Sequence, residues 1–217
     1  RDLDSSLVGS EMCIRDRYGM VAIGEAHPDR LVTNSSARPG DVLILTKPLG
    51  IGVITTALKA DAAPPSVIAR AVEVMTTLNR GAAEVMVSEG VRAGTDVTGF
   101  GLLGHLRVLA RASGVAATVR ADAVPVLEGA RPLAEAGHVP GGTKRNSRDL
   151  DPDLEVAPGV DPMTRLLLCD AQTSGGLLMA VPPDRAESVL AALGDRAPAA
   201  VRIGELREGP PGRIWIE

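Results

Sequence analysis

Residues 94–105 read GTDVTGFGLLGH, and they are the most informative stretch of this 217-residue chain. An acid, a hydroxyl residue and glycines stand directly before an apolar run of helical periodicity at 102–111. Glycines let backbone N–H groups approach an anion closely, and a helix N-terminus favours negative charge. If that anion is a phosphate, the carboxylate of Asp96 just upstream can hold Mg²⁺ against it, because Mg²⁺ prefers oxygen ligands. The alternative from these residues is that Asp96 and Thr98 cap the helix while the glycines form the turn.

Helical and strand-like segments alternate on both sides of this stretch. Continuous apolar runs or β-rich composition predict strands at 42–46, 115–119 and 177–181, and 201–206 with 213–216 is expected to form a closing strand pair. Helical composition or apolar spacing predicts helices at 53–60, 64–78, 82–89, 102–111 and 186–193. The long helix predicted at 64–78 has one apolar face, formed by Val67, Ile68, Ala71, Val74, Met75 and Leu78. The pattern indicates a mixed α/β or α+β class.

Two further glycine-rich segments are candidates for chemistry. Residues 139–146, VPGGTKRN, combine paired glycines with two cations, which is typical either of a flexible phosphate-binding loop or of a solvated surface turn. Residues 169–176, CDAQTSGG, precede a strand, and their glycine pair allows tight packing or ligand approach at the strand entrance. Cys169 is expected to be a buried small apolar residue, since no neighbouring base in sequence would activate it.

Composition excludes several classes of function. Aromatic residues make up 1% of the chain and the net charge is −4, so neither stacking platforms nor a basic field for nucleic acid are expected. No run is long and apolar enough to suggest a membrane span, and no signal peptide is visible, so a soluble, cytoplasmic protein is expected. The two cysteines and three scattered histidines match neither a zinc site nor a hydrolase triad, and His105 is expected to have a hydrogen-bonded structural role.

The N-terminal part differs from the rest. Residues 1–17 lack periodicity, and residues 6–17 among them resemble translated sequencing-adapter sequence, so we treat 1–17 as a non-native or disordered leader. A short β-like run follows at 18–24, and turn-forming residues at 33–41 suggest a connector that leads into the strand at 42–46.

Five ordered segments carry a family resemblance. They are LTKPLGIG (45–52), TDVTGFGLLGH (95–105), VPGGT with Asn146 (139–146), CD with QTSGGLL (169–178), and IGEL (203–206). In this order they resemble selenophosphate synthetase, the selenide, water dikinase family, from about Tyr18 to the C-terminus. The resemblance implies an enzyme that converts ATP, selenide and water to selenophosphate, AMP and phosphate.

The resemblance also implies a domain layout. The fold would be the one shared with aminoimidazole ribonucleotide synthetase, with nucleotide held between an N-terminal and a C-terminal domain and with a homodimer in the full-length parent. Residues 18–40 would be the remnant and connector of the N-terminal domain, and 41–217 the C-terminal ATP-binding synthetase domain.

Site residues carry over by motif. Asp96 matches the family's Mg²⁺-binding aspartate, and Thr98, Gly99 and Gly101 are candidates for lining the phosphate or nucleotide site. No catalytic residue is assigned here, because the family's cysteine or selenocysteine, its partner lysine and its other metal-binding aspartates would lie upstream of Tyr18. The chain alone is therefore expected to lack activity. The alternatives are another superfamily member, such as thiamin-monophosphate kinase or a hydrogenase-maturation enzyme, and a non-catalytic scaffold or binding domain.

Overall fold

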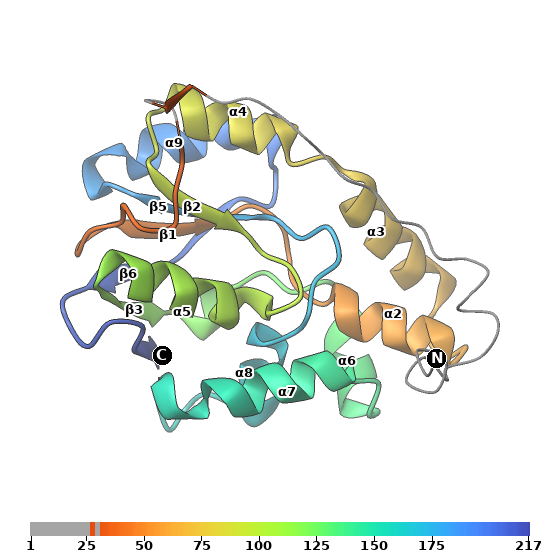
Figure 1. Ribbon diagram of the computed structural model, residues 1–217. Helices are drawn as coiled ribbons and strands as arrows, with labels where there is room; N and C mark the ends of the chain where they lie inside the picture. Colours follow the sequence, from red (N-terminus) through yellow and green to blue (C-terminus); the bar gives the residue numbers. More distant parts are fainter. Residues whose placement is uncertain (1–26, 29–30) are drawn as a thin grey trace, which may run out of the picture.

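The computed structural model describes residues 27–28 and 31–217 (Figure 1). The leader predicted at 1–17 and the strand predicted at 18–24 lie outside the described residues. Residues 33–41 lack regular helix or strand, as predicted for a connector, apart from an isolated bridge between Thr33 and Ala93. The described residues include no helix that is long and apolar enough to cross a membrane.

One mixed sheet organises the described part of the chain. Its order is β2-β5-β1-β6-β3-β7-β4, antiparallel from β2 to β3 and parallel from β3 to β4. The strands are β1 (Val42–Leu45), β2 (Ala93–Asp96), β3 (Ala116–Val119), β4 (Leu154–Val156), β5 (Leu177–Val181), β6 (Val201–Arg207) and β7 (Ile214–Ile216). The mixed α/β class and the three buried strands predicted from apolar runs are confirmed.

The expected pairing of the two C-terminal strands is wrong. β6 and β7 do not pair with each other, because β3 lies between them, antiparallel to β6 and parallel to β7. Every residue of β3 is buried, so this strand needs a hydrogen-bonded neighbour on each side.

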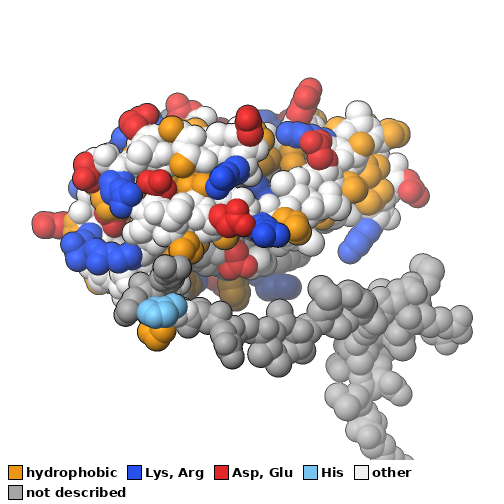
Figure 2. All heavy atoms as spheres, turned by 90° about the horizontal axis from the view of Figure 1, so that it is seen from above, with side chains coloured by type: hydrophobic (Ala, Val, Ile, Leu, Met, Phe, Trp, Pro, Cys, Tyr) orange, Lys and Arg blue, Asp and Glu red, His pale blue; other side chains and the backbone are white. Residues whose placement is uncertain are grey.

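The helices cover both faces of the sheet. In Figure 1, α4 and α9 lie on one face and α5 on the other, with α7 and α8 beyond α5. Their bounds are α2 (Ile51–Lys59), α3 (Pro65–Thr76), α4 (Arg80–Ser88), α5 (Gly101–Ser113), α6 (Ala130–Glu135), α7 (Gly141–Leu150), α8 (Pro162–Leu168) and α9 (Ala186–Leu193). Helices α5 and α9 confirm the predictions for 102–111 and 186–193. Figure 2 shows acidic and basic side chains interspersed on the face seen from above.

The interior strand β1 shows why the predicted apolar runs are continuous. Leu43 and Leu45 of β1 pack into one core, together with the apolar face of α5. Val42 and Ile44 point the other way, into a second core that includes residues of α4 and α9. Successive side chains of a strand alternate between faces, so a strand covered on both sides has no position for a polar residue.

The predicted apolar face of α3 is correct in its middle and wrong at its end. Ala71 and Val74 are buried, whereas Leu78 is 75% exposed and lies beyond the last helical residue. The hydroxyls of Thr76 and Thr77 donate to the carbonyls of Val72 (2.9 Å) and Glu73 (2.8 Å). Side-chain hydroxyls that bond to the preceding turn compete with helical continuation, and Thr77 is already extended.

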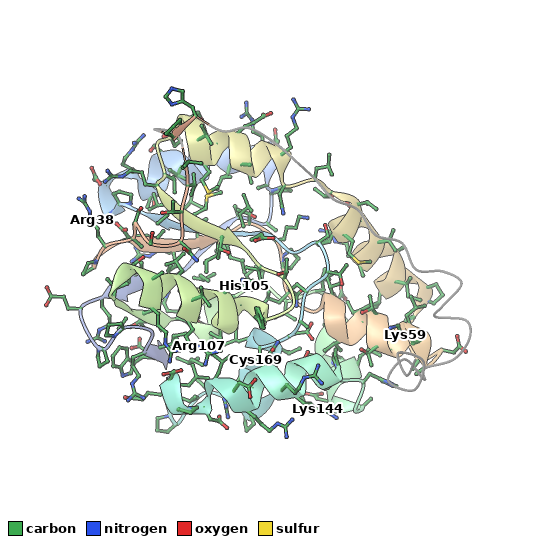
Figure 3. The ribbon with its side chains drawn as sticks, in the orientation of Figure 1. Arg38, Lys59, His105, Arg107, Lys144 and Cys169 are labelled. Atoms are coloured by element: carbon green, nitrogen blue, oxygen red, sulfur yellow. The ribbon has the colours of Figure 1, made fainter. Side chains whose placement is uncertain are left out.

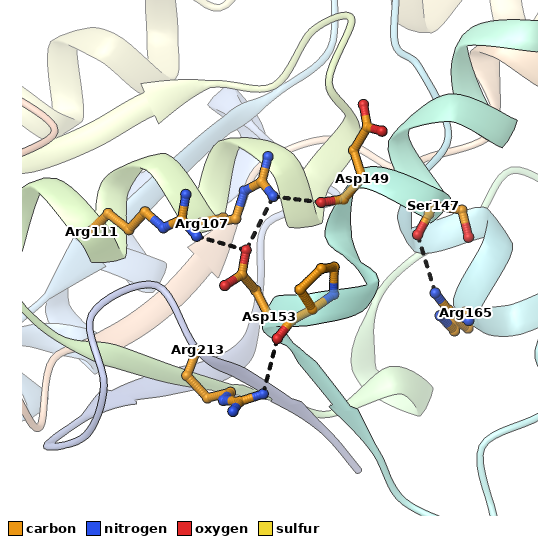
Figure 4. Close-up of polar contacts among 8 residues, drawn as sticks. Arg107, Arg111, Ser147, Asp149, Asp153, Arg165 and Arg213 are labelled. Atoms are coloured by element: carbon orange, nitrogen blue, oxygen red, sulfur yellow. Dashed lines mark hydrogen bonds and ion pairs between the residues drawn. The ribbon is translucent and has the colours of Figure 1, made fainter.

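Arginine side chains hold α7 and the turn that follows it against α5. Arg107 of α5 donates to the Asp149 carbonyl (2.8 Å) and to the Asp153 carboxylate (3.2 Å), which also receives Arg111 (2.7 Å) (Figure 4). Arg165 of α8 bonds the Ser147 carbonyl of α7. These contacts hold α7, which contains residues 141–146, beside α5, which follows residues 94–101.

Helix α8 provides a test of local electrostatics. Its N-cap Asp161 accepts hydrogen bonds from the Thr164 N–H (2.9 Å) and from Arg131 (2.6 Å), which lower the pKa of Asp161 from 3.8 to about 2. We expect an NMR titration of the Asp161 carboxyl to show that midpoint, and Arg131→Gln to raise it. Because the folded pKa is depressed, the cap's contribution to stability is present above the unfolded pKa and is lost as the pH falls towards 2. Arg70→Gln, in a separate ion pair, is the control. A midpoint near the ordinary value in the unmodified chain would contradict this account of the cap.

Candidate functional site

Four segments that are far apart in the sequence meet at one place. They are residues 96–101 between β2 and α5, 169–176 between α8 and β5, and the N-terminal turns of α2 (50–53) and α7 (141–146). Hydrogen bonds join the four segments into one connected group, and we call these residues the loop cluster. In Figure 3, His105 and Cys169 lie at its centre, while Lys144 points away on the outer side of α7.

Asp96 is the last residue of β2, where the strand leaves its partner β5. Its side chain is exposed, and within the described residues its carboxylate accepts no hydrogen bond and makes no ion pair. An exposed carboxylate without a protein partner suits Mg²⁺, which is held by one or two carboxylates together with waters and phosphates. Asp96 therefore fits the role of one oxygen ligand. Among the described residues no group of three or more His, Cys, Asp or Glu side chains forms a complete metal site.

The alternative that Asp96 and Thr98 cap the helix is wrong. Helix α5 begins at Gly101, its N-cap is Phe100, and no side chain caps it. Thr98 instead bonds to His105, whose Nε2 accepts from the Thr98 N–H (3.0 Å) and lies 3.1 Å from the Thr98 hydroxyl. Burial lowers the pKa of His105, and the negative charge of Asp96 opposes this by raising it. The lowered pKa favours the neutral ring, which is the form that lets Nε2 accept a hydrogen bond. The predicted structural role of His105 is confirmed.

The two candidate glycines of this loop differ in what surrounds them. Gly101 has φ +69°, its N–H donates to the Thr98 carbonyl (2.9 Å), and an added Cβ would lie 2.6 Å from the Cys169 carbonyl oxygen. This glycine is needed for close backbone packing, and its N–H is already used. Gly99 is exposed, nothing lies within 4 Å of an added Cβ, and its N–H donates no hydrogen bond within the described residues. Of the two, Gly99 has the N–H that is available to a ligand.

The buried carboxylate of Asp170 connects three parts of the loop cluster. Its Oδ2 accepts from the N–H groups of Gly52 (3.0 Å) and Val53 (3.3 Å) at the start of α2 and from Gln172 Nε2 (3.0 Å). Its Oδ1 accepts from the Thr143 hydroxyl of α7 (2.8 Å). Burial raises the pKa of Asp170, and these hydrogen bonds oppose the rise. One acid thus fixes the N-termini of two helices to the segment before β5.

The segment at 96–101 is joined to this arrangement through its backbone. The Thr98 carbonyl accepts from the Gln172 N–H (3.0 Å), and the Gly99 carbonyl accepts from Asn146 Nδ2 (2.9 Å). Asn146 also donates to the Cys169 carbonyl (3.2 Å). The loop that follows Asp96 is therefore held by α7 and by the 169–176 segment, while the Asp96 side chain stays exposed.

The prediction of a flexible basic loop or surface turn at 139–146 is wrong. Residues 141–146 form the first turns of α7, which follows Pro140. Lys144 and Arg145 are exposed, whereas Thr143 is fully buried and bonds Asp170. Pro140 favours this outcome because its fixed φ suits the start of a helix, and the buried threonine provides an anchor that a free loop would lack.

Cys169 has the structural role that we predicted. It is fully buried, and burial raises the pKa of its thiol to about 12, so it stays protonated. The glycine pair that follows it is tightly packed, as expected at a strand entrance: a Cβ on Gly176 would lie 2.5 Å from the Lys47 backbone nitrogen.

Asp170, Thr143 and Gln172 are the residues whose roles sequence reasoning missed. All three stood in segments that we noted for their glycines, and the available signal was an acid between an apolar helix and a glycine pair. Their function comes from partners about 27 and 118 positions away in the sequence, which spacing alone does not show.

Comparison with known proteins gives a consistent picture. Residues 38–217 match the family described as AIR synthase related protein, C-terminal domain. The chain is 45% identical over 201 residues to the selenide, water dikinase of Caldanaerobacter subterraneus subsp. tengcongensis, covering 92% of this chain and 58% of the relative. It is also 45% identical over 204 residues to the selenide, water dikinase of Myxococcus xanthus, covering 92% of this chain and 58% of that relative. The chain thus spans about 58% of the length of these curated relatives.

Solved structures share the fold at lower identity. Hydrogenase maturation protein HypE in complex with ATP aligns with a TM-score of 0.59 at 22% identity, covering 86% of this chain and 50% of that one. Thiamine-monophosphate kinase from Stenotrophomonas maltophilia K279a aligns with a TM-score of 0.52 at 18% identity, covering 86% of this chain and 52% of that one. At these identities the likeness shows a common fold.

Proposed function

The chain belongs to the AIR synthase related protein family, as its C-terminal domain, and we propose that it is the C-terminal part of a selenide, water dikinase. The observation that carries the proposal is the 45% identity to relatives of that name over 201 residues. The loop cluster supports it, because the hydrogen bonds of Asp170 and Asn146 bring together parts of four of the five segments that resemble the family. The whole enzyme would convert ATP, selenide and water to selenophosphate, AMP and phosphate.

In this proposal the loop cluster holds the phosphates of ATP through Mg²⁺. Asp96 would supply one oxygen ligand, and the Gly99 N–H would lie beside the phosphates. Mg²⁺ bound to phosphate oxygens neutralises charge that resists phosphoryl transfer. Thr98 and Gly101 would act through the loop rather than by direct contact, since the N–H of Thr98 bonds His105 and that of Gly101 bonds Thr98. Asp170 would keep the loop in place without touching the nucleotide.

ATP as a substrate agrees with the relatives of the same fold. HypE was solved in complex with ATP, and a thiamine-monophosphate kinase, AaThiL, was solved with AMPPCP and TMP. We extend nucleotide binding to this chain because the fold is shared. We also propose a cytoplasmic homodimer for the full-length enzyme, in line with the family resemblance.

Catalysis would require groups that this sequence does not match. The family's nucleophilic cysteine or selenocysteine and its lysine have no counterpart in residues 18–217, and Cys169 is buried with a raised pKa. Phosphoryl transfer depends on several groups positioned as a unit, so we expect the 217-residue chain by itself to be inactive.

Joining the chain to the N-terminal segment of a family relative provides the test. The joined protein should convert ATP to AMP only when selenide and Mg²⁺ are present, and the 217-residue chain should not. A second assay replaces selenide with thiamin monophosphate, because thiamine-monophosphate kinase shares the fold and is the alternative that this substrate tests. A rate of AMP release that is the same with and without selenide, or phosphorylation of thiamin monophosphate, would contradict the proposal.

A further inference from the structure

A pocket of about 90 Å³ lies beside the loop cluster. It is bounded by the end of β1, the junction of α3 and α4, and the turn after α9. None of the residues that line it belongs to the loop cluster; they include Lys47, Val74, Thr77, Leu78, Arg196 and Ala197. A single water needs roughly 10–15 Å³, so the space suits a small organic molecule rather than one water.

Lys47 places a buried cation at the wall of this pocket. The residue is 7% exposed, and its Nζ donates to the carbonyls of Thr77 (2.7 Å) and Ser174 (2.9 Å). An ammonium has three N–H donors, so two neutral acceptors leave one donor unused. Within the described residues Lys47 makes no ion pair. Burial lowers its pKa, as expected for a cation whose charge is not balanced.

The other charged groups around the pocket do not balance Lys47. Glu73, the acid in the lining, pairs with Arg70 at 2.6 Å and is largely exposed. Arg196 is exposed at the rim and adds positive charge. Apolar side chains, among them Val74, Leu78 and Ala197, make up much of the remaining wall. A mostly apolar pocket with a buried charged donor in its wall is a usual form of a small-molecule site.

We propose that this pocket binds a small monocarboxylate with a short apolar chain. Its carboxylate accepts a hydrogen bond from Lys47 Nζ and balances the buried charge, and its chain lies against the apolar wall. Phosphate is the poorer match, because a dianion is bound by several strong donors and the buried wall offers one spare N–H. This site takes no part in the reaction proposed above and does not depend on it.

Butyrate is the probe for the test, titrated into the 217-residue chain by calorimetry at an ionic strength held constant with chloride. We expect saturable binding, weakened about tenfold or more by Lys47→Met, since a hydrogen bond to a charged group is lost. Lys59→Met is the matched control, because Lys59 is exposed at the far end of α2 (Figure 3), and this variant should bind as the unmodified chain does. Inorganic phosphate is titrated in parallel and should bind more weakly.

An NMR titration of the unmodified chain tests the role of Lys47 without a substitution, so its result does not depend on whether the lysine variant folds. The ε-methylene signal of Lys47 should shift as butyrate is added, with the same midpoint as the calorimetric titration, while the Lys59 signal stays in place. No saturable butyrate binding, an unchanged affinity in a folded Lys47→Met variant, a Lys47 signal that does not move, or tighter binding of phosphate would each overturn the proposal.

Discussion

Asp96→Asn in the protein joined to a family N-terminal segment is expected to lower selenide-dependent AMP formation by about 10²–10³-fold. The change keeps the size of the side chain and removes the negative charge that the proposed Mg²⁺ site needs. Within the described residues the Asp96 carboxylate makes no hydrogen bond or ion pair, so folding should not depend on it. The measurement is the rate of AMP release together with the thermal midpoint of unfolding, which should stay the same.

Asp184→Asn is the matched control for that variant. Asp184 is also an exposed acid, and it lies in the turn before α9, outside the loop cluster. We expect its AMP release to equal that of the unmodified protein. If Asp96→Asn kept full activity at every Mg²⁺ concentration, the metal role of Asp96 would have to be abandoned, although the family assignment would stand.

Asp170→Ala is expected to have the largest effect on stability, lowering the free energy of unfolding of the 217-residue chain by about 3–5 kcal/mol. The carboxylate is fully buried and accepts from Gly52, Val53, Thr143 and Gln172. Removing it leaves four donors without an acceptor in a site that water does not reach. A buried donor left unpaired costs about 1–3 kcal/mol, and partial relaxation lowers the total. Urea unfolding followed by circular dichroism measures the change.

Two companion variants make the Asp170 result interpretable. Asp184→Ala removes an exposed acid and should change the free energy of unfolding by less than about 0.5 kcal/mol. Asp170→Asn keeps one acceptor oxygen and should fall between the unmodified chain and Asp170→Ala. A loss below about 1 kcal/mol for Asp170→Ala would show that the four hydrogen bonds do not hold the loop cluster together.

Much of the architecture follows from local pattern. Val42–Leu45 and Leu177–Val181 are apolar throughout, and only a strand covered on both faces suits such a run. Helix α9 was predicted with its observed bounds, because Gly194 follows its last apolar residue. The pairing of β6 was not predictable in this way, since the choice between β3 and β7 as its neighbour depends on burial of β3 by the rest of the chain.

The site was predicted only in part, for a related reason. The stretch around Asp96 contains its own signal, an acid and glycines before a helix, and the structure places Asp96 exposed beside that helix. The segment 139–146 has an equally loop-like composition, yet Thr143 is drawn into the core by Asp170 and the segment becomes helical. Composition describes what a segment tolerates, whereas a buried partner from another part of the chain decides what it forms.

Phosphorus NMR of the products shows whether the joined protein makes selenophosphate. The joined protein would be incubated with ATP, Mg²⁺ and selenide, and the phosphorus-containing products identified. We expect selenophosphate, AMP and orthophosphate in equal amounts, and we expect the 217-residue chain alone to form none of them. A well-folded joined protein that yields ADP, or AMP without a phosphorus–selenium product, would contradict the assignment to the selenide, water dikinases.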